Sequence, residues 1–280
     1  MKKVCKFCKL KISKQLSVCD YNKKKTNAKF YECKNCQVIF QPDKIKYLYN
    51  NQDSSNYNLN KNFFYYLKQL ILIFFILNLK NFFSNKKDIL DYGCGSGELA
   101  IALSYFFKNK NIFTSDVFKL GKEFIPNIKK HFLLHKGQLK GKKFDLIIMR
   151  HVFEHIFDLK SFINQIKKNL KDKKSILIIE VPNQNSLWRK IMKSRWPGYF
   201  YPFHYYVFSN HFLKKFLYKN GFEILETRNL EPPIIGSFLL TFGFNKSICK
   251  FLSIFFYPLQ FIISKFCFRS EAILLILKQK

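Results

Sequence analysis

One segment constrains the fold more than any other: an apolar run, three alternate glycines, then a helix-like stretch. Residues 88–92 form a β-like run, Gly93, Gly95 and Gly97 follow, and residues 98–107 have helical periodicity. Glycines at a strand–helix junction let the backbone turn sharply and approach a ligand closely. The segment therefore predicts a ligand-binding loop at the end of a strand.

The rest of the chain alternates between short β-like runs and helix-like stretches such as 159–170. This alternation is typical of an α/β fold with a doubly wound parallel sheet. The expected strands are 88–92, 111–115, 131–134, 144–149, 175–181, 222–228 and 272–277. A chain of 280 residues, 48% of them hydrophobic, is long enough for one full-size α/β domain and a small appendage.

An acidic residue stands where the second strand of this sheet ends. Asp116 follows Gly97 by 19 residues. A carboxylate at this position accepts hydrogen bonds from both hydroxyls of a ribose. The alternative is that Gly93–Gly97 is an ordinary turn and Asp116 an ordinary cap.

Residues 91–97 match Asp-x-Gly-x-Gly-x-Gly throughout. This is the first motif of the class I S-adenosylmethionine-dependent methyltransferases, which the chain resembles over roughly residues 60–280. The resemblance implies S-adenosylmethionine as cofactor and a seven-stranded, mostly parallel Rossmann-like sheet with helices on both faces. Residues 272–277 resemble the extra antiparallel strand of that fold. The expected cofactor contacts are Asp91, Gly93, Cys94, Gly95, Gly97, Asp116, Val117, Gln138 and Arg150.

The segment after the fourth expected strand contains His151, Glu154 and His155. It resembles the His-x-x-Glu-His segment of methyltransferases that include ubiquinone-type and sugar O-methyltransferases. If a helix begins here, the three side chains share one face. A histidine suits removal of a hydroxyl proton. We favour His155 over His151 as the base, because the adjacent Glu154 should raise the pKa of His155; the alternative is that Glu154 and His155 only brace the structure.

An aromatic loop, residues 196–204, follows the fifth strand and ends at His204. The Pro202-Phe203-His204 and Phe208-Ser209 segments resemble the Pro-x-His and Phe-Ser segments of the same methyltransferases. The loop is interpreted as a substrate wall with His204 as a third catalytic candidate, or as a packed aromatic loop. The chain lacks the Asn/Asp-Pro-Pro-Tyr/Phe motif of many amino-directed nucleic-acid methyltransferases after the fourth strand. That absence argues against methylation of nucleic-acid amines.

Two Cys-x-x-Cys pairs lie near the N-terminus: Cys5 with Cys8, and Cys33 with Cys36. Four thiolates so paired can close a tetrahedral structural site for one zinc ion; the alternatives are redox pairs or a site that has lost its metal. No apolar leader precedes them, so we expect a reducing, cytoplasmic setting. Residues 31–42 resemble a zinc ribbon found ahead of methyltransferase domains in bacterial sugar and cell-surface glycan pathways.

These features predict a zinc-ribbon module at 1–42, a linker at 43–62 and a methyltransferase domain at 63–280. We expect the module to have a core separate from that of the cofactor domain. Residues 63–83 predict a long apolar helix of the core. The apolar insertion 232–268 is either a lid over the active site or a membrane-surface hairpin, which would add peripheral membrane contact.

The formal net charge is +31, and the basic residues are dispersed along the chain. Compositional bias, an anionic membrane surface and nucleic acid each account for such a charge. The expected function is O- or C-methylation of a small molecule, sugar or cell-surface glycan precursor. The alternatives are a zinc-ribbon RNA methyltransferase and a non-catalytic, membrane-associated member of the fold.

Overall fold

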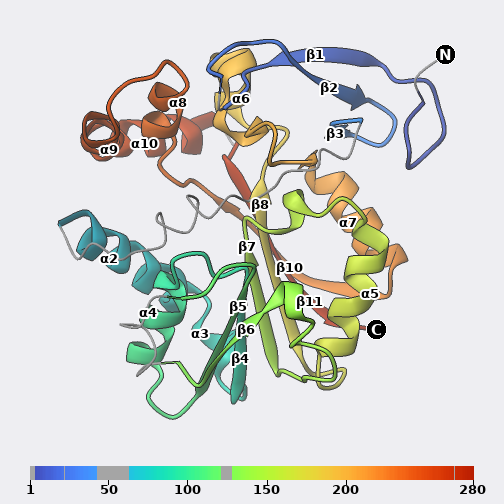
Figure 1. Ribbon diagram of the computed structural model, residues 1–280, viewed down its shortest axis with the longest axis vertical. Helices are drawn as coiled ribbons and strands as arrows, with labels where there is room; N and C mark the ends of the chain where they lie inside the picture. Colours follow the sequence, from blue (N-terminus) through green and yellow to red (C-terminus); the bar gives the residue numbers. More distant parts are fainter. Residues whose placement is uncertain (1–3, 22, 43–62, 121–127, 268) are drawn as a thin grey trace.

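The computed structural model describes residues 4–21, 23–42, 63–120, 128–267 and 269–280 (Figure 1). The linker expected at 43–62 lies outside these residues. The larger of two sheets has seven strands in the order β10-β11-β8-β7-β4-β5-β6. Its strands are β4 (Asp88–Tyr92), β5 (Asn111–Asp116), β6 (Lys130–Leu133), β7 (Leu146–Arg150), β8 (Ile176–Pro182), β10 (Phe222–Leu230) and β11 (Ala272–Gln279).

Each strand expected from the sequence is present, with its ends shifted by at most two residues. The central strands β7 and β8 are almost wholly buried, as their aliphatic runs predict for a sheet covered on both faces. β11 runs antiparallel between β8 and β10, whereas β4 pairs in parallel with β5 and β7. The prediction of a seven-stranded, mostly parallel Rossmann-like sheet is confirmed.

Helices cover both faces of this sheet (Figure 1). On one face α2 and α4 supply Leu72, Ile76 and Leu103 to a buried cluster; on the other, α5 and α7 supply Ile163 and Leu213. The long helix expected at 63–83 is divided, because a turn at residue 79 separates α2 from α3. The helices are α2 (Phe63–Asn78), α3 (Lys80–Phe83), α4 (Glu98–Phe106), α5 (Leu159–Asn169), α6 (Leu187–Met192), α7 (Asn210–Lys219), α8 (Ile235–Leu240), α9 (Lys246–Phe255) and α10 (Tyr257–Cys267).

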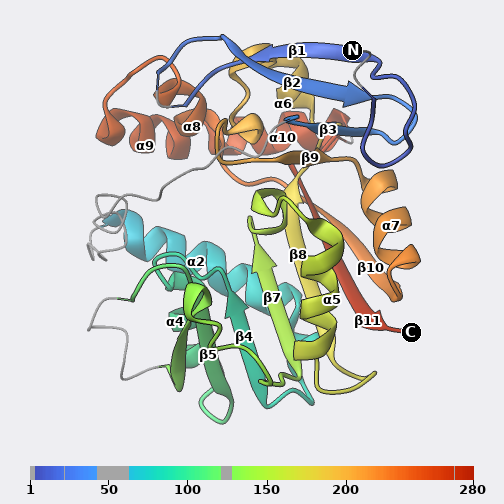
Figure 2. The ribbon, with the colours of Figure 1, turned by 45° about the vertical axis from the view of Figure 1, so that its right-hand side comes forward.

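The cysteine-rich N-terminal segment forms a second sheet that is not self-contained. Its strands β1 (Lys14–Val18), β2 (Ala28–Cys33) and β3 (Val38–Phe40) are completed by β9 (Tyr206–Phe208), which comes from the segment between β8 and β10 of the large sheet. Figure 2 shows β9 beside β3 above the large sheet. Cys33 belongs to the same buried cluster as Phe153 and Phe212. The expectation of a separate core is therefore wrong: three short strands bury too little apolar surface alone.

The apolar insertion between β10 and β11 forms the helices α8, α9 and α10. Leu230 at the end of β10 pairs with Ala272 at the start of β11, and Ala272 pairs with Pro182 at the end of β8. The insertion therefore leaves and re-enters the sheet at the carboxyl edge of β8. Within the described residues, no single helix has the length and apolarity needed to cross a membrane, whereas α9 and α10 taken together, with a bend of 55° between them, do.

Candidate active site

The glycine loop joins β4 to α4 at the carboxyl edge of the sheet. Gly93, Gly95 and Gly97 have φ angles of 69°, 54° and 76°, a region that side chains with a Cβ rarely adopt. The Gly93 N–H donates to the carbonyl of Ser115 at 2.7 Å. A Cβ on Gly93 would lie 2.5 Å from a methyl group of Val152. The sequence therefore needs glycine here both for the turn and for the close approach to the segment after β7.

Asp116 fixes the glycine loop from the end of β5. Its Oδ2 accepts a hydrogen bond from the Gly95 N–H at 2.8 Å, and its Oδ1 accepts one from the Val117 N–H at 2.7 Å. Burial raises the pKa of this carboxyl, and the backbone donors oppose that shift. A carboxylate oxygen accepts more than one hydrogen bond, so the predicted ribose contact stays a prediction compatible with this geometry.

Asp91 lies in β4, directly before the glycine loop. It is buried, and burial raises its pKa to about 7 despite the nearby charge of Arg150. Among the residues that the structure describes, none gives its Oδ2 a hydrogen bond. Such an oxygen calls for a donor. The α-amino group of S-adenosylmethionine is a cationic donor, so the site fits this cofactor.

The other expected cofactor contacts line the same edge. The Cys94 N–H donates to the carbonyl of Ser115 at 3.0 Å, which holds Cys94 in the loop. The Gln138 side-chain oxygen accepts a hydrogen bond from the Leu133 N–H at 2.8 Å, so Gln138 closes the turn after β6. Contacts of these residues and Val117 with a cofactor stay predictions.

A charged cluster lies where β7 and β8 end. Arg150 Nε donates to Glu180 Oε2 at 2.5 Å, and His151 Nε2 lies 3.3 Å from Glu180 Oε1. His151 Nδ1 lies 3.3 Å from Glu154 Oε1. Desolvation lowers the pKa of His151, but the two carboxylates raise it more, to about 10. His151 is therefore an imidazolium at neutral pH, which argues against its predicted role as a base.

The helix expected at residues 151–155 is absent. His151 has a φ of 53°, and its N–H donates to the carbonyl of Glu180 at 2.9 Å. That bond holds His151 to the end of β8, so the chain makes only a 3₁₀ turn at Phe153–His155, and helix α5 begins at Leu159. The side chains of the segment nevertheless lie close together: His151 contacts Glu154, and ligand atoms of Glu154 and His155 lie within 4.8 Å of each other.

His155 and His204 lie together on the other side of Glu154. Their ring centroids are 4.6 Å apart, and His204 Nε2 lies 3.9 Å from Glu154 Oε1. Ligand atoms of Glu154, His155 and His204 lie within 4.8 Å of one another. Glu154 is fully buried. The sequence-based prediction that His155 and His204 belong to one site is thus supported by their proximity.

Burial controls the protonation of these two histidines. It lowers the pKa of His155 in spite of Glu154, and, together with the neighbouring His155, it lowers the pKa of His204 to about 3. The expected net rise in the pKa of His155 is wrong, because desolvation by burial outweighs the raising effect of Glu154. Nδ1 of His155 lies 3.0 Å from the Phe203 carbonyl, which only accepts. Nδ1 therefore carries the hydrogen, and Nε2 is a proton acceptor.

The aromatic loop 196–204 is mostly packed. Trp196 and Tyr199 are buried in a cluster with Phe30 of β2, as the packed-loop alternative predicts. Phe200 differs: its ring lies 5.3 Å from that of His204 and lines a cavity of about 290 Å³ together with Tyr21. One part of the loop therefore lines a cavity, and Phe200 relates that cavity to His204, although neither His155 nor His204 is among the lining residues.

Sequence reasoning missed Glu180 and the residues around this cavity. Glu180 is a buried carboxylate in a strand that is otherwise apolar, and a charge in such a run was an available signal. Tyr21 and Arg195 line the cavity from distant parts of the chain. No local pattern marks them, because contacts between distant segments bring them there: the Cys19 N–H donates to the Ser194 carbonyl, and the Tyr21 N–H donates to the Tyr201 carbonyl.

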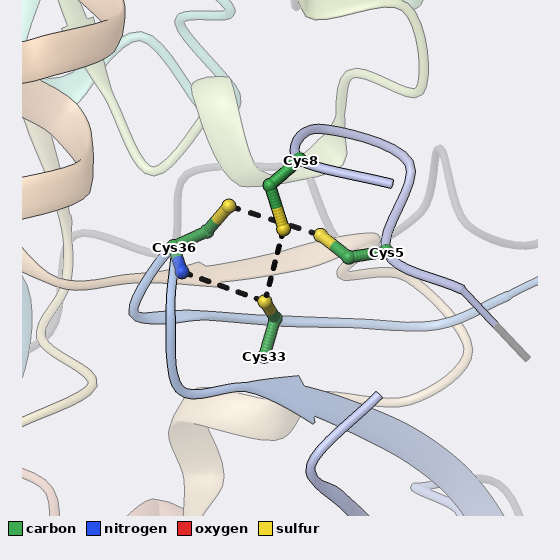
Figure 3. Close-up of side chains that lie close together, drawn as sticks. All are labelled: Cys5, Cys8, Cys33 and Cys36. Carbon is green, nitrogen blue, oxygen red and sulfur yellow. Dashed lines mark hydrogen bonds between the residues drawn. The ribbon is translucent and has the colours of Figure 1, made fainter. Parts of the chain in front are cut away.

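The four cysteines of the two pairs converge (Figure 3). The sulfur of Cys5 lies 3.9 Å from that of Cys36, and the sulfur of Cys8 lies 3.6 Å from that of Cys33. A regular tetrahedral zinc site with Zn–S bonds of about 2.3 Å has S–S edges of about 3.8 Å. All four cysteines are free thiols within 4.8 Å of one another, so the donor set and its spacing fit zinc.

Comparisons with known proteins agree with this geometry. The family model described as a methyltransferase domain matches residues 60–227. The match covers more than half of the chain, so the chain belongs to the methyltransferase domain family. No curated protein matches the chain in sequence.

Solved structures show the same fold. Coclaurine N-methyltransferase, bound to N-methylheliamine and S-adenosylhomocysteine, is similar with a TM-score of 0.50 and 15% identity, over 75% of this chain and 70% of that chain. An S-adenosylmethionine-dependent methyltransferase from Archaeoglobus fulgidus has a TM-score of 0.48 and 15% identity, over 78% of this chain and 100% of that chain. Magnesium protoporphyrin IX methyltransferase from Synechocystis PCC 6803 has a TM-score of 0.46 and 14% identity, over 82% of this chain and 94% of that chain. The family match confirms the expectation of a methyltransferase, and the fold agrees with that of coclaurine N-methyltransferase.

The charged cluster generates a titration prediction. In NMR titrations His151 should stay protonated up to about pH 10, whereas His204 should stay neutral down to about pH 3. Because the folded pKa of His151 is raised, its ion pairs stabilise the fold fully below about pH 6.5 and are lost as the pH rises through about 10. In Glu180→Gln the pKa of His151 should fall by about one unit or more. A His151 that titrates near pH 6.5 in the wild type would contradict the cluster.

Proposed function

We propose that this methyltransferase transfers a methyl group to an oxygen or carbon of a small molecule, sugar or cell-surface glycan precursor. The observation that carries the proposal is the neutral imidazole of His155, whose Nδ1 faces the Phe203 carbonyl. Its Nε2 is left to accept a proton, which a hydroxyl must lose when its oxygen is methylated. His204 lies beside it.

The cofactor rests on the glycine loop in this proposal. When bound, S-adenosylmethionine supplies an electrophilic methyl group on a sulfonium. Asp91 holds the cofactor's ammonium group with its unpartnered Oδ2, and Asp116 accepts from the ribose hydroxyls while it fixes Gly95. These contacts orient the cofactor, and alignment of the reacting groups accounts for most of the rate enhancement.

The charged cluster keeps the catalytic edge electrically balanced. Arg150 and His151 carry positive charge, and Glu154 and Glu180 compensate it. Because the charges cancel, the edge has no net positive field that would repel the positively charged sulfonium of S-adenosylmethionine. Burial keeps His155 neutral, so that its Nε2 can accept a proton.

The acceptor class is supported by the cavity that Phe200 lines, since the ring of Phe200 also contacts that of His204. Tyr21, Trp196 and Phe200 are among its walls, and Arg195 adds a charged group. Apolar and aromatic walls with a few polar groups are typical of small-molecule sites. The sequence after β7 is Arg150-His151-Val152-Phe153 in place of the motif that holds a base amine, which disfavours the RNA alternative.

The four cysteines hold one structural zinc ion in this proposal. Phe7, between the first pair, packs on Phe212 at 4.7 Å and on Tyr206 at 5.7 Å. Tyr206 begins β9, two residues after His204. The metal therefore stabilises a sheet that in turn positions His204 and the cavity wall.

The cofactor site is tested by Asp91→Asn. The substitution removes the charge and leaves the side-chain shape, so S-adenosylmethionine should bind about tenfold to a hundredfold more weakly by calorimetry, as expected for a hydrogen bond to a charged group of about 1.5–3 kcal/mol. Asp88→Asn, at the opposite end of β4, is the matched control and should bind normally. Equal affinity of Asp91→Asn and the wild type would remove Asp91 from the site.

The base is tested by His155→Gln. With an acceptor that the wild type methylates, kcat should fall by about 10²-fold to 10⁴-fold, the affinity for S-adenosylmethionine should not change, and the acidic limb of the pH–rate profile should disappear. His211→Gln, at an exposed position of α7, should behave as the wild type. If cofactor affinity or the melting temperature falls instead, His155 is a structural brace and no base.

The metal is tested by Cys33→Ser. Wild-type protein prepared without chelator should contain about one zinc per chain by elemental analysis. The variant should lose the metal and, because Cys33 belongs to the main buried cluster, should lower the melting temperature of the whole chain. Cys267→Ser, at an exposed thiol, should keep both. Wild-type protein free of zinc would refute this assignment.

A further inference from the structure

The helices α9 and α10 expose large apolar side chains, which is unusual for surface helices of a protein surrounded by water. The only residues of α10 that are buried are polar, Gln260 and Ser264. Its exposed face carries Leu259, Ile262 and Phe266, of which Phe266 is 81% exposed. A surface helix of a water-soluble domain buries its apolar stripe and exposes its polar one, so this helix has the opposite orientation.

The helix α9 also carries large apolar side chains on its exposed face. Its one buried residue is Cys249, and Gly236 of α8 approaches so closely that an added Cβ would lie 2.5 Å from the Cys249 carbonyl oxygen. The large side chains Ile248, Phe251 and Phe255 are each more than half exposed. Small residues at the contact and large apolar ones outside are typical of helices that pack within lipid.

Hydrogen bonds hold α10 in this orientation. The Gln260 side-chain oxygen accepts from the Ile234 N–H at 3.1 Å, and its nitrogen donates to Glu231 at 3.0 Å. The Ser264 hydroxyl accepts from the Trp188 indole at 2.7 Å. Rotation of the helix to bury its phenylalanines would break these buried bonds, so the apolar face stays outward.

The charge of the insertion indicates what covers this face. Residues 232–268 contain Lys246, Lys250 and Lys265 and no aspartate or glutamate. Basic residues beside an exposed aromatic face are typical of helices that lie in the interface of an anionic membrane, and each lysine near such a surface adds about 1 kcal/mol of attraction. The net charge of +31 has the same sign.

The bend between α9 and α10 and the hydrogen bonds that hold α10 favour lying on the bilayer over crossing it, although the two helices together would be long enough to cross. α9 has 10 residues and α10 has 11, with a bend of 55° between them. At about 1.5 Å per residue each helix measures about 15 Å, half of the ~30 Å hydrocarbon core. Both helices therefore fit within one leaflet's interface.

We propose that the α8–α10 hairpin docks this protein on an anionic lipid bilayer. The hairpin is inserted at the carboxyl edge of the sheet, next to the end of β8, where the glycine loop and the histidines also lie. Docking thus brings the catalytic edge to the membrane surface and gives it access to acceptors held there. α2, whose Phe74 is exposed, lies on the same side of the molecule as α9 in both views (Figures 1 and 2).

The test is vesicle co-sedimentation of the full chain, which needs neither an acceptor nor an active enzyme. The wild type should bind phosphatidylcholine vesicles that contain about one third phosphatidylglycerol at least tenfold better than pure phosphatidylcholine, and salt should weaken this binding. The double variant Phe251→Ser/Phe255→Ser should lose at least nine tenths of the bound fraction. Tyr105→Ser/Tyr218→Ser removes two rings that are 58% and 59% exposed elsewhere and should bind as the wild type.

Further measurements separate the alternatives. Unchanged circular dichroism and S-adenosylmethionine affinity in both double variants exclude misfolding, since the replaced rings are exposed. A wild type that ignores vesicles, or equal losses in both variants, would overturn the proposal. So would a wild-type dimer that Phe251→Ser/Phe255→Ser converts into a monomer without an effect on vesicle binding, because a second copy of the chain would then cover the face. Failure of cofactor binding with intact vesicle binding would instead count against the proposed enzymatic function alone.

Discussion

Several carboxylates are buried where the strands of the large sheet end, and the need to pair their negative charge with positive groups determines the local structure of the active site. Asp91, Glu154 and Glu180 are all buried there, and an isolated charge in such a place is costly. Arg150 and His151 compensate Glu180, and His151 also compensates Glu154. To reach both acids, His151 adopts a left-handed backbone conformation. The chain therefore passes close to Gly93, and His155 turns toward His204.

Asp91 is the one of these three acids that no ion pair with a described residue compensates directly. Its Oδ2 has no partner among the described residues, and burial raises its pKa to about 7. A cationic hydrogen-bond donor from a ligand would lower the pKa of Asp91 toward its ordinary value and offset the cost of desolvating the carboxylate. The buried Asp91 is therefore placed to bind a positively charged group of a ligand. The glycine loop between β4 and α4 supplies the backbone turn around that group.

The two sheets depend on each other through β9. This strand begins two residues after His204 and pairs with β3 of the cysteine-rich sheet, while the Tyr205 N–H donates to the Glu154 carbonyl at 2.8 Å. The cysteine site, the histidine pair and the cavity wall are thus linked within a few residues. The cysteine-rich segment acts as a part of the active-site scaffold.

The strands and the glycine loop were predictable because they depend on local patterns. Apolar runs such as 176–181 specify buried strands, and the spacing of Gly93, Gly95 and Gly97 specifies the loop. The partners of His151 could not be predicted from the sequence, because Glu180 lies 29 residues away and comes near His151 only through the pairing of β7 with β8. The addition of β9 to the N-terminal sheet and the outward apolar face of α10 likewise depend on contacts between distant segments.

The central claim is that the edge formed by Asp91, the glycine loop and Asp116 binds S-adenosylmethionine. A crystal structure of the chain with S-adenosylhomocysteine tests it most directly. The account predicts the ligand's amino nitrogen within about 3 Å of Asp91 Oδ2 and its ribose hydroxyls against Asp116. A ligand bound elsewhere, or an Asp91 whose Oδ2 still lacks a donor in the complex, would contradict it.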